Sequence, residues 1–462
     1  MNGNNTPFVM DNKFVFLIFG ASGDLASLKI FPTIFELALQ KRFTNDFLVL
    51  GYSRSKLTKK EFQDKFRKSI QNKFDMDEYF EKVLDDLVQK IDYISGEYDK
   101  LEDFKICDKY IQDKIDSNLI ISYFAVPPFL FKPIIQNLSS IKNDRDFRLI
   151  IEKPFGEDEQ SASDLFLQIS ELFCENDIYL LDHYLGKKPI RSILPLRSRN
   201  RALNTLLKPE EISNIQITAY EDMGVEDRIG YYDDNGVIKD MVQSHLLQIL
   251  SLLTMNIPIL QGSNDISNHK NSILSSLKFE EDEKNISIAQ YENYPTKKST
   301  PTSVELKLKI NRQDYYDVPI YIRSGKNYAK KHTYICVELK KFEFQDEDTP
   351  PNRILIEFYP EEKISIKLVD IDGVLSSIND IEISDSLSCE GDFCLPSHGV
   401  LFLDVFKKDK RYFLSFNEIV SAWKFTDTVT SFIKKNNIKT TKYPIGETKM
   451  NKLDFKWYEG IS

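Results

Sequence analysis

In the first part of the chain, short continuous runs of apolar residues alternate with longer segments that have a helical pattern. Residues 14–20 read Phe-Val-Phe-Leu-Ile-Phe-Gly, which is typical of a strand buried on both faces of a parallel sheet. A helical pattern follows over about 24–41, with Leu25, Leu28 and Ile34 on its apolar side. More helices are expected within 58–90 and near 129–140, and further short apolar runs that predict strands lie at 47–50, 93–96, 119–126 and 147–152. Strands that alternate with helices in this way predict a doubly wound α/β domain.

The hydrophobic pattern changes after about residue 182. Within 214–221, Ile215, Ile217 and Ala219 alternate with polar residues and Tyr220, and the same alternation recurs at 304–310, 334–339, 354–359 and 363–369. Such strands are typical of an antiparallel sheet with one covered face. Helices expected to cover that face lie near 186–206, 237–255 and 416–435.

Polar stretches in this second part are expected to be loops or lids, at 261–272, 281–302, 341–352 and 370–398. The patterns together predict two domains. Residues 1–180 form a Rossmann-type doubly wound domain of the α/β class. Residues 181–462 form an α+β domain with a large, mainly antiparallel sheet covered by helices.

Composition and charge exclude several kinds of partner. The chain has 61 Lys and Arg against 71 Asp and Glu, a net charge of −10, which argues against binding to nucleic acid or to a membrane, because both need a positive surface. Residues 1–13 lack the pattern of a signal peptide, and the apolar stretches are shorter than the roughly 20 residues of a membrane helix. Of the five cysteines only Cys389 and Cys394 lie close together, without a suitably spaced histidine, so we expect no metal site. A soluble cytoplasmic protein is expected.

A glycine-containing turn follows the first predicted strand, although the chain has only 17 glycines. It consists of Gly20, Ala21, Ser22, Gly23, Asp24 and Leu25. Glycines let the backbone approach a pyrophosphate, whose charge then lies against the N–H groups of the helix start. An ordinary strand–helix turn fits two glycines equally well. The position in the first βα turn of an α/β domain favours nucleotide binding.

The next predicted strand ends in Gly51-Tyr-Ser-Arg54-Ser-Lys56. NAD-binding proteins place an acid near this strand end, where it binds the ribose 2′-OH, whereas an Arg there accommodates a 2′-phosphate. The absence of an acid favours NADP over NAD. A solvated basic turn is the alternative interpretation of the same residues.

Further residues that could bind a ligand or take part in catalysis lie later in the chain. Lys153 lies in Glu-Lys-Pro-Phe-Gly after the strand at 147–151, and its bond to Pro154 is a candidate for the cis form. On a helix, the five-residue spacing of Asp240 and His245 puts the two side chains at about 140° around the axis, so that they can flank a pocket. A histidine on a helix is, however, more often a structural residue than a base. The segment Arg323-Ser-Gly-Lys326, with Lys330 and Lys331 nearby, suits an anionic substrate, although a solvated basic loop is the default for such a run.

From about residue 14 to 457 these segments resemble the glucose-6-phosphate dehydrogenase family. The family's G-A-S-G-D-L-A stands at 20–26, its G-Y-A-R-S at 51–55, its A-L-P-P at 125–128 and its E-K-P-F-G at 152–156. Its signature R-I-D-H-Y-L-G-K-E stands at 180–188, G-Y-F-D at 230–233, D-x-x-Q-x-H-L-L-Q at 240–248 and R-x-G-K at 323–326. Of these motifs, the D-H-Y-L-G-K core of the signature is highly specific to the family.

The resemblance implies the activity and the site residues. Glucose 6-phosphate is oxidised to 6-phosphogluconolactone with NADP, the first step of the oxidative pentose phosphate pathway, by a homodimer or a dimer of dimers. His245 is the general base and Asp182 orients it. His183, Tyr184, Lys187 and Lys331 bind the 6-phosphate, and Lys153, Glu221, Asp240 and Lys326 bind the sugar. Pro127 and Lys153 join the glycine turn and Arg54 as cofactor-binding residues.

Several positions depart from the family pattern. Leu180 and Lys188 replace the Arg and the acid at the ends of the signature, and Tyr359 stands where the family usually has a Gln. Glu357 and His332 occupy positions that are basic in members with a second, structural NADP, which argues against that second site. These departures motivate two alternatives, a dehydrogenase of another sugar phosphate and a catalytically silent NADP-binding paralogue.

Overall fold

The computed structural model describes residues 8–43, 46–226, 229–344, 349–372, 377–386, 395–448 and 452–459. The chain divides into two compact units. The first contains residues 1–156, 160–186 and 389–416, and the second contains 157–159, 187–388 and 417–462.

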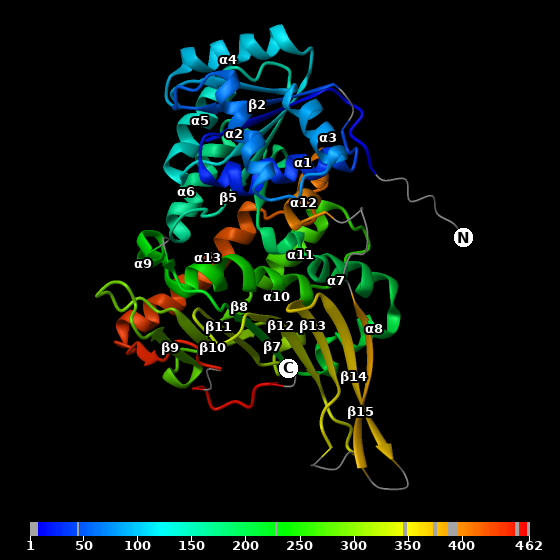
Figure 1. Ribbon diagram of the computed structural model, residues 1–462. Helices are drawn as coiled ribbons and strands as arrows, with labels where there is room; N and C mark the ends of the chain where they lie inside the picture. Colours follow the sequence, from blue (N-terminus) through cyan, green and yellow to red (C-terminus); the bar gives the residue numbers. More distant parts are fainter. Residues whose placement is uncertain are drawn as a thin grey trace. The chain divides into compact units, whose positions relative to one another are not determined.

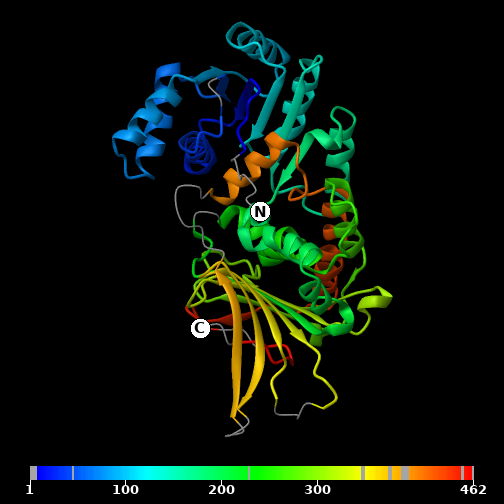
Figure 2. The ribbon, with the colours of Figure 1, turned by 90° about the vertical axis from the view of Figure 1, so that its right-hand side faces the viewer.

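The first unit is built on a parallel sheet, as predicted. Among the described residues it has six strands in the order β3-β2-β1-β4-β5-β6, with the parallel pairings typical of dinucleotide-binding folds. The strands are β1 (Phe14–Phe19), β2 (Phe47–Ser53), β3 (Ile91–Ser95), β4 (Leu119–Phe124), β5 (Asp146–Glu152) and β6 (Ile178–Leu181). β1 is buried throughout, because helices lie on both faces of the sheet (Figure 1 and Figure 2).

Helices connect the strands of the first unit, and Figure 2 shows the early ones on one side of the sheet and the later ones on the other. They are η1 (Ala26–Ile30), α1 (Phe31–Leu39), α2 (Lys59–Gln71), α3 (Glu78–Val88), α4 (Leu101–Lys114), η2 (Pro128–Leu130), α5 (Phe131–Ser140), α6 (Glu159–Ser170), η3 (Glu175–Asp177) and η4 (His183–Gly186). The helical segment predicted over 58–90 is thus two helices, and a capping box at Thr58 and Glu61 starts the first.

The first predicted helix has a different form from the one expected. Residues 26–30 form a π-helical turn, in which the Phe31 N–H donates to the Ala26 carbonyl, and the α-helix starts only at Phe31. Pro32 has no N–H to donate to the carbonyl of Leu28, which an α-helix would require. The prediction that Leu28 lies on the apolar side was therefore wrong, and its side chain is 70% exposed.

A late segment of the chain returns to the first unit as α12 (Ser397–Lys407). Arg148 on β5 is buried, and its Nη1 donates to the Val405 and Phe406 carbonyls at 2.7 and 2.8 Å. Leu180 on β6 forms a bridge to Leu414. Nothing in the hydrophobic pattern indicates this return, because a helix pattern does not show which sheet it packs against.

The second unit contains the large sheet. In the described part of the chain it has ten strands, nine in the order β15-β14-β13-β12-β7-β11-β10-β9-β16 and β8 paired with β10. Most pairings are antiparallel, as predicted, and β11 with β7 and β16 with β9 are parallel. The strands are β7 (Ile212–Tyr220), β8 (Leu277–Lys278), β9 (Ile286–Tyr291), β10 (Ser303–Ile310), β11 (Ile320–Gly325), β12 (His332–Leu339), β13 (Arg353–Tyr359), β14 (Lys363–Asp372), β15 (Ser377–Ser386) and β16 (Thr441–Tyr443).

Helices of the second unit lie on one side of this sheet (Figure 1), as the sequence predicts. They are α7 (Lys188–Arg199), α8 (Arg201–Leu206), η5 (Pro209–Glu211), α9 (Ile229–Val237), η7 (Ile238–Leu246), α10 (Leu247–Thr254), α11 (Ser263–Leu274), η8 (Glu283–Asn285), η9 (Gln313–Tyr315) and α13 (Phe416–Lys435), whose first residue belongs to the first unit. No helix among the described residues is long and apolar enough to cross a membrane.

Three of the four predicted loops contain regular structure. Residues 263–274 form α11, 286–291 form β9, and 377–386 form β15, which pairs with β14 over its whole length. The partner that stabilises α11 lies far away in the sequence, whereas β9 and β15 pair with the neighbouring strands β10 and β14. In the fourth segment, 341–352, residues 345–348 lie outside the described residues, as do Cys389 and Cys394.

The polar helix α11 is held by a buried ion pair. The Lys270 Nζ lies 2.7 Å from Glu418 Oε2 on α13, and the two side chains are 1% and 0% exposed. Ser267 Oγ donates to the other carboxylate oxygen at 2.8 Å. Taking one partner away would leave a buried, uncompensated charge.

We therefore expect Lys270→Met to lower the free energy of unfolding of the second unit by about 3–5 kcal/mol, because the Glu418 carboxylate loses its counterion in the interior. Chemical denaturation followed by circular dichroism measures the change. The double variant with Glu418→Leu should recover most of the loss, since both charges are then absent. Equal stability of Lys270→Met and the unchanged protein would contradict this interpretation.

Candidate active site

In the first unit, the predicted nucleotide turn follows β1 at the edge where the parallel strands end. Gly20 has a φ of +78°, and a Cβ there would lie 2.1 Å from the Ala125 carbonyl oxygen at the end of β4. Only glycine fits such an approach in this conformation. The Gly20 N–H donates to the Tyr52 carbonyl at 2.9 Å, and the Gly23 N–H donates to the Gly20 carbonyl at 2.9 Å. The turn therefore forms a cradle with bare backbone, which suits a pyrophosphate.

Hydroxyl groups gather beside this cradle. Ser53 Oγ donates to Ser22 Oγ at 2.9 Å, Ser22 Oγ lies 2.9 Å from Ser55 Oγ, and the Tyr93 hydroxyl lies 2.7 Å from Ser53 Oγ. Sequence reasoning identified Ser22 and missed Ser53, Ser55 and Tyr93. The G-Y-S-R-S motif contained the signal, because its two serines flank Arg54 at the end of β2.

Arg54 is exposed, and its guanidinium carbon lies 5.6 Å from the centre of the Tyr98 ring. Burial raises the pKa of Tyr98 to about 12, with Arg54 opposing the rise, so the ring is a neutral phenol at pH 7. A guanidinium that packs against an aromatic face keeps its N–H donors directed outward for an anion. Pro127, exposed at the start of η2 after β4, lies on the same edge of the sheet.

Lys153 follows β5, and its peptide bond to Pro154 is cis, as anticipated. Its neighbour Glu152 accepts a hydrogen bond from the buried Tyr123 hydroxyl, and His398 Nε2 on α12 lies 3.8 Å from the same carboxylate. Burial lowers the pKa of His398 to about 4. Both of these partners of Glu152 are thus neutral at pH 7.

The D-H-Y segment follows β6. Asp182 is buried and accepts the Tyr184 N–H at 2.9 Å. The rings of His183 and Tyr184 lie 4.9 Å apart in an edge contact. Asp182 belongs to the first unit and His245 to the second, so the pairing of these two residues stays a prediction.

In the second unit, Asp240 and His245 lie on η7, which is π-helical. The Leu247 N–H at its end donates to the Val242 carbonyl, an i→i+5 bond. The α-helical angle of about 140° does not apply, because residues five apart are about one turn apart on a π-helix. Both side chains are buried, at 3% and 1% exposure.

Lys326 lies between acidic groups near the end of β11. Its ammonium forms an ion pair with Glu221 and lies 3.5 Å from Asp240 Oδ2. It also lies 5.3 Å from the centre of the Tyr232 ring. Burial raises the pKa of Tyr232 well above its usual value, and Asp240 adds to the rise. The structure thus brings together Glu221, Asp240 and Lys326, which are suited to bind sugar hydroxyls through charge-assisted hydrogen bonds.

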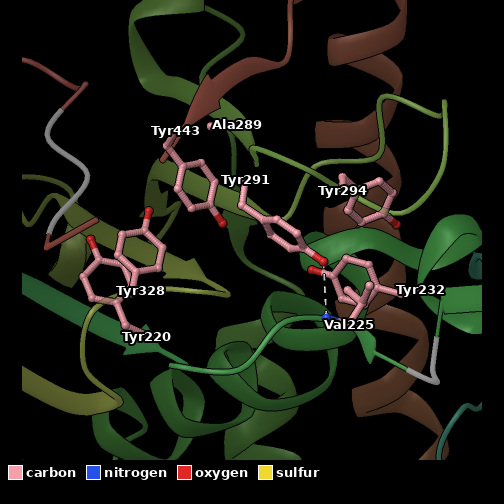
Figure 3. Close-up of a cluster of buried hydrophobic side chains, with 8 residues drawn as sticks. All are labelled: Tyr220, Val225, Tyr232, Ala289, Tyr291, Tyr294, Tyr328 and Tyr443. Carbon is pink, nitrogen blue, oxygen red and sulfur yellow. Dashed lines mark hydrogen bonds between the residues drawn. The ribbon is translucent and has the colours of Figure 1, made fainter. Parts of the chain in front are cut away.

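Residues 323–325, expected in a turn, lie in β11, and a cluster of mainly aromatic side chains that sequence reasoning missed supports the end of this strand and Lys326. Figure 3 shows the cluster, which consists of Tyr220, Val225, Tyr232, Ala289, Tyr291, Tyr294, Tyr328 and Tyr443. The Tyr443 hydroxyl donates to the Lys326 carbonyl at 2.6 Å, and the Tyr220 and Tyr328 rings stack 4.0 Å apart. Gly325 is required here, because a Cβ would lie 2.3 Å from the Tyr328 ring.

The remaining predicted cations lie elsewhere in the second unit. Lys187 precedes α7, and Lys331 precedes β12 with its ammonium 4.8 Å from the centre of the Tyr359 ring. The departures His332 and Glu357 lie on β12 and β13. Burial lowers the pKa of His332, with Arg323 adding to the effect, so His332 supplies no positive charge at pH 7.

The strand order of the first unit, the glycine cradle and the arginine after β2 define a dinucleotide-binding protein. The comparison with family models identifies the family. The model "Glucose-6-phosphate dehydrogenase, NAD binding domain" matches residues 17–192, and "Glucose-6-phosphate dehydrogenase, C-terminal domain" matches 194–456. The chain belongs to the glucose-6-phosphate dehydrogenase family.

Relatives and solved structures of this family match nearly the whole length of the chain. The chain is 33% identical over 465 residues to the cytoplasmic glucose-6-phosphate 1-dehydrogenase 5 of Arabidopsis thaliana, covering 95% of this chain and 90% of the relative. It is 31% identical to the Schizosaccharomyces pombe enzyme, covering 93% and 90%. A solved glucose-6-phosphate dehydrogenase in complex with its substrate glucose 6-phosphate is 27% identical, with a TM-score of 0.88 and coverage of 98% and 100%.

We expect Gly20→Ala to weaken dinucleotide binding by at least about tenfold and to lower the melting temperature, because the new Cβ meets the Ala125 carbonyl and the φ angle is strained. Isothermal titration with NADP and a thermal melt measure the two effects. Gly230→Ala is the control, since a Cβ there meets nothing within 4 Å. Unchanged NADP affinity in Gly20→Ala would show that the cradle is an ordinary turn.

Proposed function

We propose that this chain oxidises glucose 6-phosphate to 6-phosphogluconolactone with NADP, the first step of the oxidative pentose phosphate pathway. The observation that carries the proposal is the match of both family models, which together span residues 17–456. The bare glycine cradle at the ends of the parallel strands and the buried acid–lysine group near η7 support it.

The residues of the first unit fit NADP. Gly20, Ala21, Ser22, Gly23, Asp24 and Leu25 would bind the pyrophosphate, and Arg54 the 2′-phosphate, with Pro127 and Lys153 further along the same edge. When bound, NADP supplies the nicotinamide that accepts the hydride from C1. The serine hydroxyls beside the cradle would add donors for the phosphate oxygens.

His245 would remove the proton of the C1 hydroxyl, so that the lactone carbonyl forms as the hydride departs. Asp182 would accept the other ring N–H of His245, which fixes the tautomer and favours the imidazolium that the reaction forms. The burial of both side chains supports these roles, because a base shielded from water keeps its orientation.

Charged side chains would bind the two ends of the sugar phosphate. Glu221, Asp240, Lys326 and Lys153 would hold the ring hydroxyls, and His183, Tyr184, Lys187 and Lys331 the 6-phosphate. The departures at 180, 188 and 359 lie outside this set. A panel of sugars with and without the 6-phosphate therefore tests the substrate as well as the reaction.

We also propose a cytoplasmic enzyme that assembles as a homodimer or a dimer of dimers. Relatives from Arabidopsis thaliana and Solanum tuberosum are named as cytoplasmic forms. The large sheet of the second unit would supply the dimer surface.

With glucose 6-phosphate and NADP, we expect His245→Asn to lower kcat by roughly 10²- to 10⁴-fold, the contribution of a positioned base. Its affinity for NADP should stay within about twofold, and the absorbance of reduced nicotinamide measures the rate. His269→Asn on α11 is the matched control and should keep the full rate. A His245→Asn enzyme with the unchanged rate would exclude this residue as the base, and no turnover by the unchanged protein would exclude the proposed function.

We expect Arg54→Ala to raise the KM for NADP by about tenfold or more, because a hydrogen bond to a charged phosphate contributes about 1.5–3 kcal/mol. The KM for NAD should change less than twofold, since NAD lacks the 2′-phosphate. Steady-state rates with both cofactors measure the two constants. Lys60→Ala, an exposed cation on α2, is the control. An equal loss with both cofactors would contradict the role of Arg54.

A further inference from the structure

The turn between β13 and β14 touches a predicted phosphate ligand. Tyr359 ends β13, and its ring lies under the Lys331 ammonium at 4.8 Å. The strand register explains the contact, because Thr333 on β12, two residues after Lys331, is paired with Tyr359. A cation over an aromatic face is attracted to it and loses part of its freedom of movement. The contact thus holds the end of a long, exposed side chain.

The same turn carries a half-buried carboxylate near other cations. Glu362 comes three residues after Tyr359, and burial raises the pKa of its carboxyl while Lys187 and Lys188 oppose the rise. Lys188 begins α7, which packs against β13. One turn therefore contacts Lys331 through a ring and carries a carboxylate that Lys187 and Lys188 influence electrostatically.

The charges of this group fit a phosphate monoester. Lys187, Lys188 and Lys331 are positive and Glu362 is negative, which leaves an excess of positive charge for a dianion. Ammonium groups bind phosphate as point charges, so their positions decide the affinity. A carboxylate next to them neutralises part of that charge and competes with the phosphate for it.

We propose that the β13–β14 turn tunes the phosphate subsite, with Tyr359 as a positioning residue for Lys331 and Glu362 as the counterion that the phosphate of the substrate displaces. This inference rests on the proposed function for the identity of the ligand. It assigns a role in this subsite to Tyr359, Glu362 and Lys188. This role explains why the aromatic ring of Tyr359 and the cation at 188, where the family has an acid, occur together.

The first test is Tyr359→Leu with Tyr359→Phe beside it. Loss of the ring should raise the KM for glucose 6-phosphate about two- to fivefold, the equivalent of an exposed cation–π contact, with kcat within twofold. Tyr359→Phe keeps the ring and should restore the KM. Equal KM values in all three proteins, or a change in kcat alone, would overturn the role of Tyr359.

The second test is Glu362→Gln with Glu361→Gln, an exposed neighbour, as its control. Removing the counterion should lower the dissociation constant of inorganic phosphate, the probe here, about threefold, and this gain should shrink at high salt. Glu361→Gln should change the constant less. A weaker or unchanged affinity in Glu362→Gln would overturn the role of the counterion.

The two proposals fail in distinguishable ways. If the protein oxidises glucose 6-phosphate but the variants leave its KM and phosphate affinity unchanged, this inference fails and the proposed function stands. If the protein has no turnover, the proposed function fails, and titration with inorganic phosphate still tests the turn. Phosphate binding that follows the ring and the Glu362 charge would then support the subsite alone.

Discussion

The parallel register of β1 with β2 and β4 determines where the candidate groups of the first unit lie. Parallel strands end at the same edge of their sheet, and each βα turn starts there. Gly20 follows β1, Arg54 follows β2, Pro127 follows β4 and Lys153 follows β5. The cost of this arrangement is steric, because the chain after β1 must pass within van der Waals contact of the end of β4, and only a glycine allows it.

In the second unit, the main constraint is the burial of charged side chains. An ammonium loses several kcal/mol of hydration when it is buried, and only close counterions offset that loss. Lys326 is 5% exposed and has Glu221 and Asp240 as partners. The tyrosine cluster fixes the backbone of its turn through the Tyr443 hydroxyl. The hydroxyls of a sugar that binds there would replace water molecules next to charged groups that are already held in place.

The sequence was sufficient for the features that depend on local patterns. Continuous apolar runs predicted β1, β4 and β5, and the glycine pattern predicted the turn after β1 at Gly20. Features that depend on distant partners were missed. The helix α11 reads as a polar loop because its stabilising partner Glu418 is about 150 residues away. The serine hydroxyls beside the Gly20 turn and the tyrosine cluster were missed, because the contacts of their hydroxyl groups depend on how the strands pair in the sheet.

Local hydrogen bonding also changed what a spacing means. The five-residue spacing of Asp240 and His245 predicts side chains that flank a pocket on an α-helix, but η7 is π-helical and sets them about one turn apart. Likewise a π turn precedes α1 next to Pro32, and Leu28 in that turn is exposed. Interpreting a residue spacing requires a helix type, and the α-helix was assumed here. Both π-helical segments that differ from it lie at or next to candidate site residues.

The reversed charge at Lys188 shows how a departure from a family pattern can be offset within the fold. A cation in the first turn of a helix is unfavourable, because the exposed N–H groups there carry partial positive charge. An acid at this position would be favourable, and α7 lacks an acid in its first turn. Glu362, in the connection after β13, interacts electrostatically with Lys187 and Lys188 and brings a negative charge from another part of the chain. The electrostatic requirement of the helix is therefore met by a residue that no motif around position 188 could indicate.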